Sequence, residues 1–371
     1  MKKGIWIVIA SVVALVTLAV VIPCLPAGET SAGGNYQVLG PIRHGNLTIF
    51  PVVSSHSHDT SEFLTLDEGL RSGEVVVTEA GNATPLVRPR RGRSGVQEFH
   101  GNDGAEVNRL LLVNNSKRPL LLLAGEIVTG GKQDRIIGKD RLVPAESDPI
   151  DLSVFCVEPG RWVERSSKFN APSANSIVGA MVQPSVRSKA MADKDQQQVW
   201  NEVRNARGGA VSGLPAPAQA QVEGTSSYAA MIANNEVQHK LEAVAAPVQE
   251  EYQSVIKQLR DRNAVGIVVA VNGEVIWADI FASTKLLEKY WPKLVRSYAA
   301  ESFAQRSKSA SVNTKDAQEF LDRLQGKREV VENEPGLYRH TEISGDGFKV
   351  FELASLLPGT GFDLHLAKMA E

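Results

Sequence analysis

The stretch AVGIVVAVNGEVIWADIFA, residues 264–282, decides the fold, because its two apolar runs are separated only by Asn272-Gly273. A two-residue Asn-Gly connection favours a type I′ turn, in which both residues have a positive φ. Asn and Gly tolerate that backbone conformation better than other residues do. The stretch therefore predicts an antiparallel β-hairpin.

Short apolar runs also fill the region from Tyr36 to about Val163. These runs are YQVLG, NLTIFPVVS, EVVVTEA, NRLLLVNN, RPLLLLAGEIV, RLVPAE and DLSVFCVE. Parallel strands need crossovers of a dozen or more residues, so closely spaced runs favour antiparallel pairing. A short helix is expected in residues 64–73, where Asp67 and Glu68 suit a first helical turn.

Helical patterns occupy residues 173–206, with a break at Pro184, and residues 226–262, with an interruption near Pro247. Residues 207–226 between them are rich in Gly, Pro and Ala, which predicts an exposed loop. Further helical patterns and closing strands follow the hairpin, in residues 283–305, 316–326, 338–344, 347–355 and 362–369. The chain thus predicts an α+β fold with an antiparallel, β-rich N-terminal half, a helical middle section and a mixed C-terminal part that packs back on the first half.

An uncharged apolar segment, residues 4–23, follows Lys2 and Lys3. About 20 helical residues reach roughly 30 Å, the thickness of the hydrocarbon core of a bilayer. Cations before such a segment tend to stay in the cytoplasm, which places the rest of the chain on the far side. We therefore expect one N-terminal transmembrane or signal helix, a flexible linker at 24–35 and a globular domain at 36–371.

A retained membrane anchor is preferred over a cleaved signal peptide. The apolar segment is longer than the usual 7–15 residues of a signal peptide, and Leu25-Pro26-Ala27 is a poor cleavage site. Cys24 follows Pro23, which argues against lipoprotein processing. The expected location is therefore membrane-anchored on the extracytoplasmic side, with secretion after signal cleavage as the alternative.

Charge argues against a nucleic-acid partner. The 371 residues contain 40 Lys and Arg and 42 Asp and Glu, a net charge of −2. A chain with so little net charge produces no field that attracts a polyanion. Its 43% hydrophobic content is that of an ordinary globular protein, so disorder of the whole chain is also excluded.

The densest polar motif is AGEIVTGGKQDRIIGKD, residues 124–140, followed by DLSVFCVEPGRW, residues 151–162. The adjacent Gly130 and Gly131 allow a tight turn or a close backbone approach. Period-two alternation places Cys156 and Glu158 on one face of a strand. The candidate ligand-binding residues of this motif are Glu126, Lys132, Gln133, Asp134, Arg135, Cys156, Glu158, Arg161 and Trp162.

These residues resemble a domain family named for its association with ADP-ribosylglycohydrolase and rhodanese-phosphatase proteins, the ARPP-1 family. The matching stretches are residues 118–135, 154–162, 265–281 and 291–302, and the resemblance covers nearly the whole chain from Tyr36 onward. It implies a role near ADP-ribose or another nucleotide-derived ligand, and it supplies no reaction, cofactor or catalytic residue to transfer.

Three interpretations of the motif stay open. Lys132 and Arg135 could bind a small anionic or sugar-like ligand with help from glycine backbone amides, which makes the domain a ligand-binding or protein-interaction module. The charges could instead form an ion-pair network that stabilises a loop. In a third interpretation the domain is a hydrolase of glycosidic or phosphoester bonds, with Glu126, Asp134 or Glu158 as acid or base.

Other polar features have simpler explanations. Cys156 could be a nucleophile, but a small buried hydrophobe in a strand is the more common role of a free cysteine. His56 and His58 lie two residues apart and could share a metal, yet the polar stretch SSHSHDTSE predicts a solvated loop, and no metal site is assigned.

The arginine-rich residues 88–93 are predicted to form an exposed loop, with binding of anionic headgroups as the alternative. Trp162, Trp277 and Trp291 are expected in the core.

Overall fold

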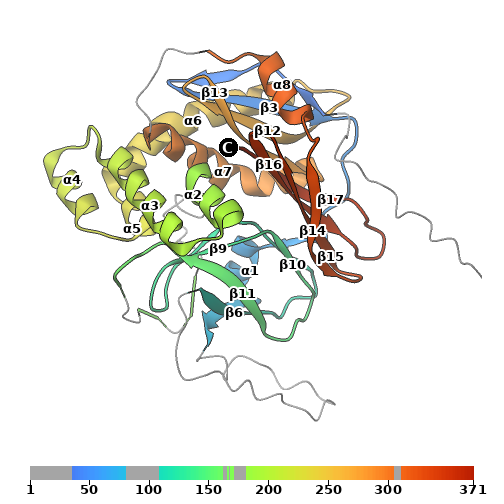
Figure 1. The fold of residues 1–371 in the computed structure, drawn as a ribbon, viewed down its shortest axis with the longest axis horizontal. Coiled ribbons are helices and arrows are strands. Elements are labelled where there is room, and N and C mark those ends of the chain that lie inside the picture. Colours follow the sequence, from blue (N-terminus) through green and yellow to red (C-terminus); the bar gives the residue numbers. More distant parts are fainter. Residues whose placement is uncertain (1–35, 81–107, 162–164, 167, 171–180, 305–310) are drawn as a thin grey trace, which may run out of the picture. The chain divides into compact units, whose positions relative to one another are not determined.

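The hairpin lies inside a nine-stranded sheet of the computed structural model (Figure 1). The structure describes residues 36–80, 108–161, 165–166, 168–170, 181–304 and 311–371. The large sheet contains β1 (Gln37–Val38), β2 (Ile42–His44), β3 (Leu47–Ser54), β12 (Asn263–Val271), β13 (Glu274–Phe281), β14 (Lys327–Glu334), β15 (Tyr338–Gly345), β16 (Phe348–Ser355) and β17 (Asp363–Ala370). Its order is β1-β3-β12-β13-β17-β16-β15-β14, with β2 also paired to β3, and every pairing is antiparallel.

The predicted turn is confirmed. Val271 pairs with Glu274, and Asn272 and Gly273 have φ values of 56° and 81°, as a type I′ turn requires. On its other side β12 pairs with β3, so the C-terminal part does return to the first strands. Because the hairpin is internal, both of its faces are buried, which explains its nearly continuous apolar sequence.

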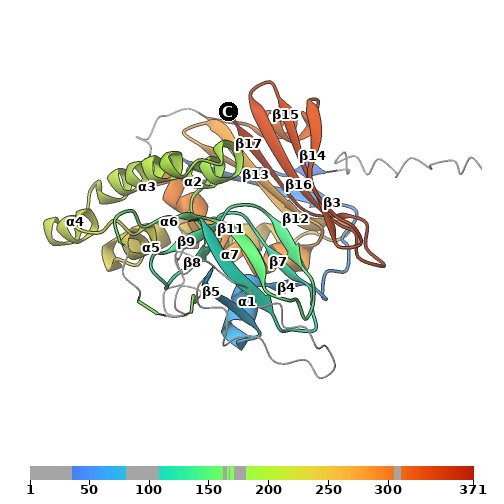
Figure 2. The ribbon, with the colours of Figure 1, turned by 60° about the horizontal axis from the view of Figure 1, so that its bottom comes forward.

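Two smaller sheets lie beside the large one (Figure 2). The five-stranded sheet is β5 (Val75–Glu79), β6 (Arg109–Asn114), β11 (Ile150–Cys156), β9 (Arg135–Ile137) and β8 (Ile127–Val128), in that order. The three-stranded sheet is β10 (Arg141–Val143), β7 (Leu120–Leu122) and β4 (Leu64–Thr65). Among the described strands, only the pair of β4 and β7 is parallel, so antiparallel pairing is confirmed for the rest.

The helices are α1 (Leu66–Ser72), α2 (Pro184–Ser188), the π-helix Lys189–Asp193, α3 (Gln196–Val211), α4 (Ala216–Glu223), α5 (Tyr228–Ile232), α6 (Asn235–Lys257), α7 (Thr284–Ala304) and α8 (Thr314–Asp322). Alternation along β12 separates two cores. Ile267 and Val269 pack with side chains of α6 and α7, whereas Val268 packs with Phe320 of α8. The large sheet is therefore covered by helices on both faces.

Two predictions about the helical middle were wrong. Residues 207–226 are not one exposed loop: they contain the end of α3 and the helix α4, whose Val222 is buried in the core. Pro247 does not interrupt α6, which continues through it. Tertiary packing of Leu241, Ala245 and Val248 compensates for the hydrogen bond that proline cannot donate.

Four features predicted from the sequence lie outside the described residues: the anchor segment 4–23, the linker 24–35, Cys24 and the arginine-rich residues 88–93. Within the part of the chain that the structure describes, no helix combines the length and apolarity needed to cross a membrane. The mixed α+β class with antiparallel sheets is confirmed, as are the buried positions of Trp277 and Trp291. Trp162 falls outside the described residues.

Candidate functional site

Asp134, Glu158 and Arg161 meet where the loop before β9 approaches the chain just after β11; we call them the Glu158 cluster. Nη2 of Arg161 lies 2.6 Å from Oε2 of Glu158 and 3.6 Å from Oδ1 of Asp134. The backbone N–H of Asp134 donates to the same Glu158 oxygen at 3.0 Å. Both carboxylates are buried. The sequence motif thus does bring these candidates together.

Every carboxylate oxygen of the Glu158 cluster has a donor. Ser227 Oγ donates to Oδ2 of Asp134 at 2.8 Å, and the N–H of Gly130 donates to Oδ1 at 3.2 Å. Oε1 of Glu158 pairs with Arg165 at 3.3 Å. Burial, and then the nearby Glu158 carboxylate, raises the pKa of Asp134. In this conformation neither carboxylate presents a free oxygen to a substrate.

The two glycines of the motif allow the close approach that the sequence suggested. Gly130 and Gly131 have φ values of 130° and 50°. A Cβ on Gly131 would lie 2.2 Å from the ring of Phe169, and one on Gly130 would lie 2.6 Å from the hydroxyl of Ser166. The next residue, Lys132, is half-buried, and its backbone N–H donates to Glu79 at 2.8 Å. The loop is held against its neighbours by contacts that a side chain would prevent.

The remaining candidates near this loop, Gln133, Arg135 and Cys156, are buried inside the protein. The side-chain amide of Gln133 donates to the carbonyl of Glu158 at 3.1 Å. Arg135 is buried on β9 opposite Cys156 on β11, and burial lowers the pKa of its guanidinium. Cys156 is also buried, and burial raises the pKa of its thiol. A buried thiol with a raised pKa is a poor nucleophile, which favours the simpler explanation of this cysteine.

Glu126 belongs to a different cluster, which we call the Glu126 cluster and which also contains Lys293 and Asp67. Nζ of Lys293 lies 2.5 Å from Glu126 and 2.6 Å from Asp67. The N–H of Leu123 donates to the other oxygen of Glu126 at 2.7 Å. Burial raises the pKa of Glu126 to about 7, against the attraction of Lys293. Among the described residues, Glu126 and Glu158 have different partners, and an acid–base pair of these two is not supported.

A third cluster, the His365 network, was missed by the sequence interpretation. His365 Nδ1 lies 2.5 Å from Asp140 and its Nε2 lies 3.1 Å from Asp279. Arg187 binds Asp279 with two hydrogen bonds of 2.9 and 3.0 Å. Tyr298 donates to the same carboxylate at 2.5 Å. All four charged side chains are fully buried.

The network joins elements that are distant in sequence. Asp140 precedes β10, Arg187 lies on α2, Asp279 on β13 and His365 on β17. The N–H of Ala124 also donates to Asp140 at 2.8 Å. One signal was available: charged residues interrupt the otherwise apolar strands WADIF and DLHLAKM, and a charge at a buried position needs a partner.

The histidines considered as metal ligands lie apart from these clusters. His56 and His58 are exposed, and the ring of His58 stacks on Phe362 with centroids 4.0 Å apart. Across the described residues, no group of His, Cys, Asp or Glu side chains could hold a metal ion.

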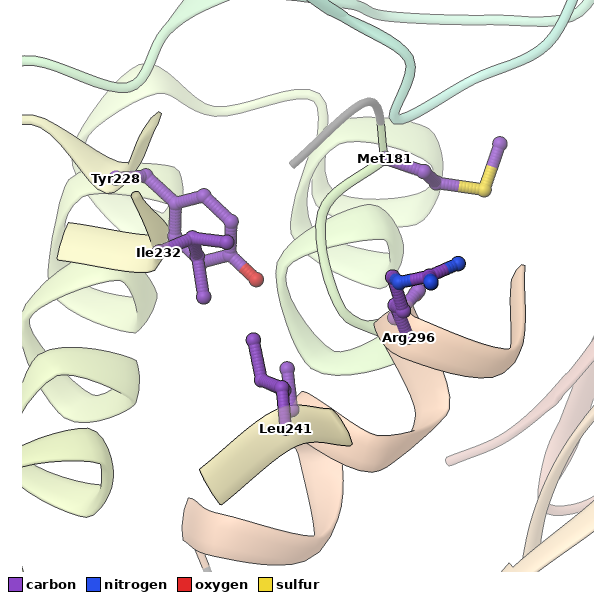
Figure 3. A pocket seen from close by; sticks show the side chains of 7 residues that line it. Met181, Tyr228, Ile232, Leu241 and Arg296 are labelled. Atoms are coloured by element: carbon purple, nitrogen blue, oxygen red, sulfur yellow. The ribbon is translucent and has the colours of Figure 1, made fainter. Parts of the chain in front are cut away.

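One small hollow lies between α5, α6 and α7 (Figure 3). Its cavity volume is about 10 Å³, roughly the space that one water molecule needs. Tyr228, Ile232 and Leu241 gather on one side of it, and Arg296 and Met181 on the other. Pockets for drug-sized ligands have volumes of about 300–1,000 Å³. This hollow is too small for a nucleotide.

The strand of the large sheet with the most exposed residues is β14, its last strand. β14 pairs only with β15 among the described strands (Figure 2). Val330 and Val331 in its middle have exposed fractions of 52% and 42%, and they are the exposed large hydrophobic residues of the described chain. A strand with one unpaired edge offers a row of N–H and C=O groups to another chain.

Comparison with known proteins identifies a family and no characterised relative. The family model described as "ARG and Rhodanese-Phosphatase-superfamily-associated Protein domain", ARPP-1, matches residues 35–367. This match confirms the resemblance seen in the sequence. No curated protein matches the chain, and no solved structure does.

Proposed function

We propose that this chain, which belongs to the ARPP-1 family, is a protein-interaction module held by residues 4–23 on the extracytoplasmic side of a membrane. The exposed edge of β14 is the observation that carries the proposal. Its backbone can add a strand from another chain, a common mode of protein recognition. Val330 and Val331 add apolar surface at the same place.

The buried clusters favour this proposal over a hydrolase. An acid or base has to reach a substrate, directly or through one water. Glu126, Asp134 and Glu158 are buried, and their oxygens accept hydrogen bonds from the protein or pair with its cations. A hydrolase of glycosidic or phosphoester bonds, the alternative, predicts turnover of ADP-ribose, nucleotides or sugars that Glu158→Gln abolishes.

Site-specific photocrosslinking tests the interaction function. The full chain, carrying a photoreactive residue at Val331 and kept in its native membrane, should form a protein adduct on irradiation. Lys315 on α8 is a matched control, because its side chain is 82% exposed but lies off the sheet edge. Adducts from position 331 and none from 315 are expected. Equal labelling, or no adduct at 331, would reject β14 as the interaction surface.

The proposed location has its own test. A membrane-impermeant protease added to intact cells should digest the domain, whereas a protected domain would exclude an extracytoplasmic location.

A further inference from the structure

We infer that the partner of β14 is the β14 strand of a second copy of this chain, so that two large sheets join edge to edge in antiparallel orientation. This inference rests on the proposed interaction function and names the partner. It follows from the order of charges along the strand, from the position of its bulge and from the exposed valines.

When β14 is reversed, both of its positive residues lie opposite negative or neutral residues of a second β14. Its sequence is KREVVENE, with Lys327 and Arg328 at the start and Glu332 and Glu334 at the end. In an antiparallel pair centred between the two valines, Lys327 lies opposite Glu334 of the second copy. Opposite charges at such positions stabilise a sheet, and like charges destabilise it. A parallel pair in the same register would place each charge opposite itself.

One kind of cross-strand pair in this arrangement is unfavourable, and the two-fold symmetry produces it twice. Glu329 of each copy lies opposite Glu332 of the other copy. However, Glu332 already forms an ion pair with Lys139 of its own chain. Glu329 likewise pairs with Lys327 of its own strand at 3.3 Å. These cations offset the repulsion, and Lys327 also lies opposite Glu334 of the second copy, so the two Lys327–Glu334 pairs decide the preference.

The bulge of β14 favours an identical partner. The register with β15 shifts between Val330 and Glu332, which leaves Val331 as the extra residue. Bulges protect edge strands, because a regular strand cannot keep its hydrogen bonds across the extra residue. A second β14 carries the same bulge next to the two-fold axis, so the two distortions coincide. The exposed valines then cover each other, Val330 against Val331 of the second copy.

A charge exchange tests this pairing in the full-length chain. Lys327→Glu places glutamates opposite Glu334 in a self-pair, and Glu334→Lys places lysines opposite Lys327. Each variant alone should associate at least about threefold more weakly than the wild type. An equal mixture of the two variants has opposite charges at both positions and should recover wild-type association. The association is measured by energy transfer between two differently labelled copies in detergent.

The controls separate folding from pairing. Lys327 is 81% exposed, and its substitution should leave the fold intact, which the circular dichroism of each variant checks. Lys315→Glu, a change of equal charge on α8, should leave association unchanged. A wild-type chain that stays monomeric, or a mixture that associates no better than each variant alone, overturns the second-copy inference. If position 331 then still crosslinks to a different protein, the interaction function stands; if it crosslinks to nothing, both fail.

Discussion

His365 is charged in the protein interior because Asp140 and Asp279 lie on opposite sides of its ring. Burial alone would lower the pKa of His365, but the two carboxylates outweigh burial and raise it to about 9. Arg187 and the imidazolium hold the pKa of Asp279 far below its usual value, although burial opposes them. The network therefore contains two anions and two cations and is balanced in charge.

The raised pKa of His365 predicts a pH dependence of stability. The folded protein keeps this proton up to about pH 9, whereas the unfolded chain releases it near pH 6.5. The stabilisation is therefore complete below about pH 6.5 and is lost as the pH rises through 9. The loss amounts to about 3 kcal/mol in the free energy of unfolding.

Because Lys368 also titrates in this range, with a pKa lowered by burial to about 8, the comparison should be made between wild type and His365→Gln. Denaturant unfolding from pH 6.5 to 9.5 should show that the advantage of the wild type shrinks as the pH rises. An advantage that stays constant over this range would contradict a charged His365.

Single residues also show the limit of sequence reasoning. Glu158, Asp134 and Arg161 could be grouped from one motif because they follow each other closely in the chain. His365, whose ring binds Asp140, lies 225 residues later in the chain, and spacing along the sequence contains no information about that approach. The motif also does not show whether its charged side chains are buried. Burial is the property that distinguishes a structural ion-pair cluster from a binding site that a ligand can reach.

At the scale of elements, the hairpin of β12 and β13 was predictable because its signal is local. Asn272-Gly273 determines the turn, and the two apolar runs supply the strands. The helices at 207–226 and across Pro247 were not predictable, because their stability comes from packing on distant elements rather than from local preference. Composition alone therefore predicts too few helical residues in alanine-rich segments that pack against the hydrophobic core.

Gly273→Ala tests the turn. Gly273 has a φ of 81°, a conformation that costs an alanine about 1–2 kcal/mol. The variant should lower the free energy of unfolding by that amount. Gly208→Ala is the matched control: Gly208 lies in α3 with open space around its Cα, so alanine should stabilise the protein by up to about 1 kcal/mol. Two changes of the same sign in denaturant unfolding would contradict the positive-φ turn.

At the scale of the whole molecule, buried ion pairs join the small sheets to the rest of the fold. The His365 network connects the chain before β10 to β13, β17 and α2. The Glu126 cluster connects the start of β8 to α7 and α1. The Glu158 cluster connects the loop before β9 to the start of α5 through Ser227. The polar residues that suggested a catalytic site thus hold distant elements together, which supports the proposal that the function belongs to the exposed edge of β14.

The thermal unfolding midpoint of Glu158→Gln tests this account most directly. The substitution removes the charge that pairs with Arg161 and Arg165, and breaking a buried pair costs about 3–5 kcal/mol. The midpoint should fall by several degrees. Arg165→Gln, at a side chain that is 57% exposed, should change it little. If Glu158→Gln instead melts like the wild type and abolishes turnover of ADP-ribose, a nucleotide or a sugar, the carboxylate is catalytic and the account is wrong.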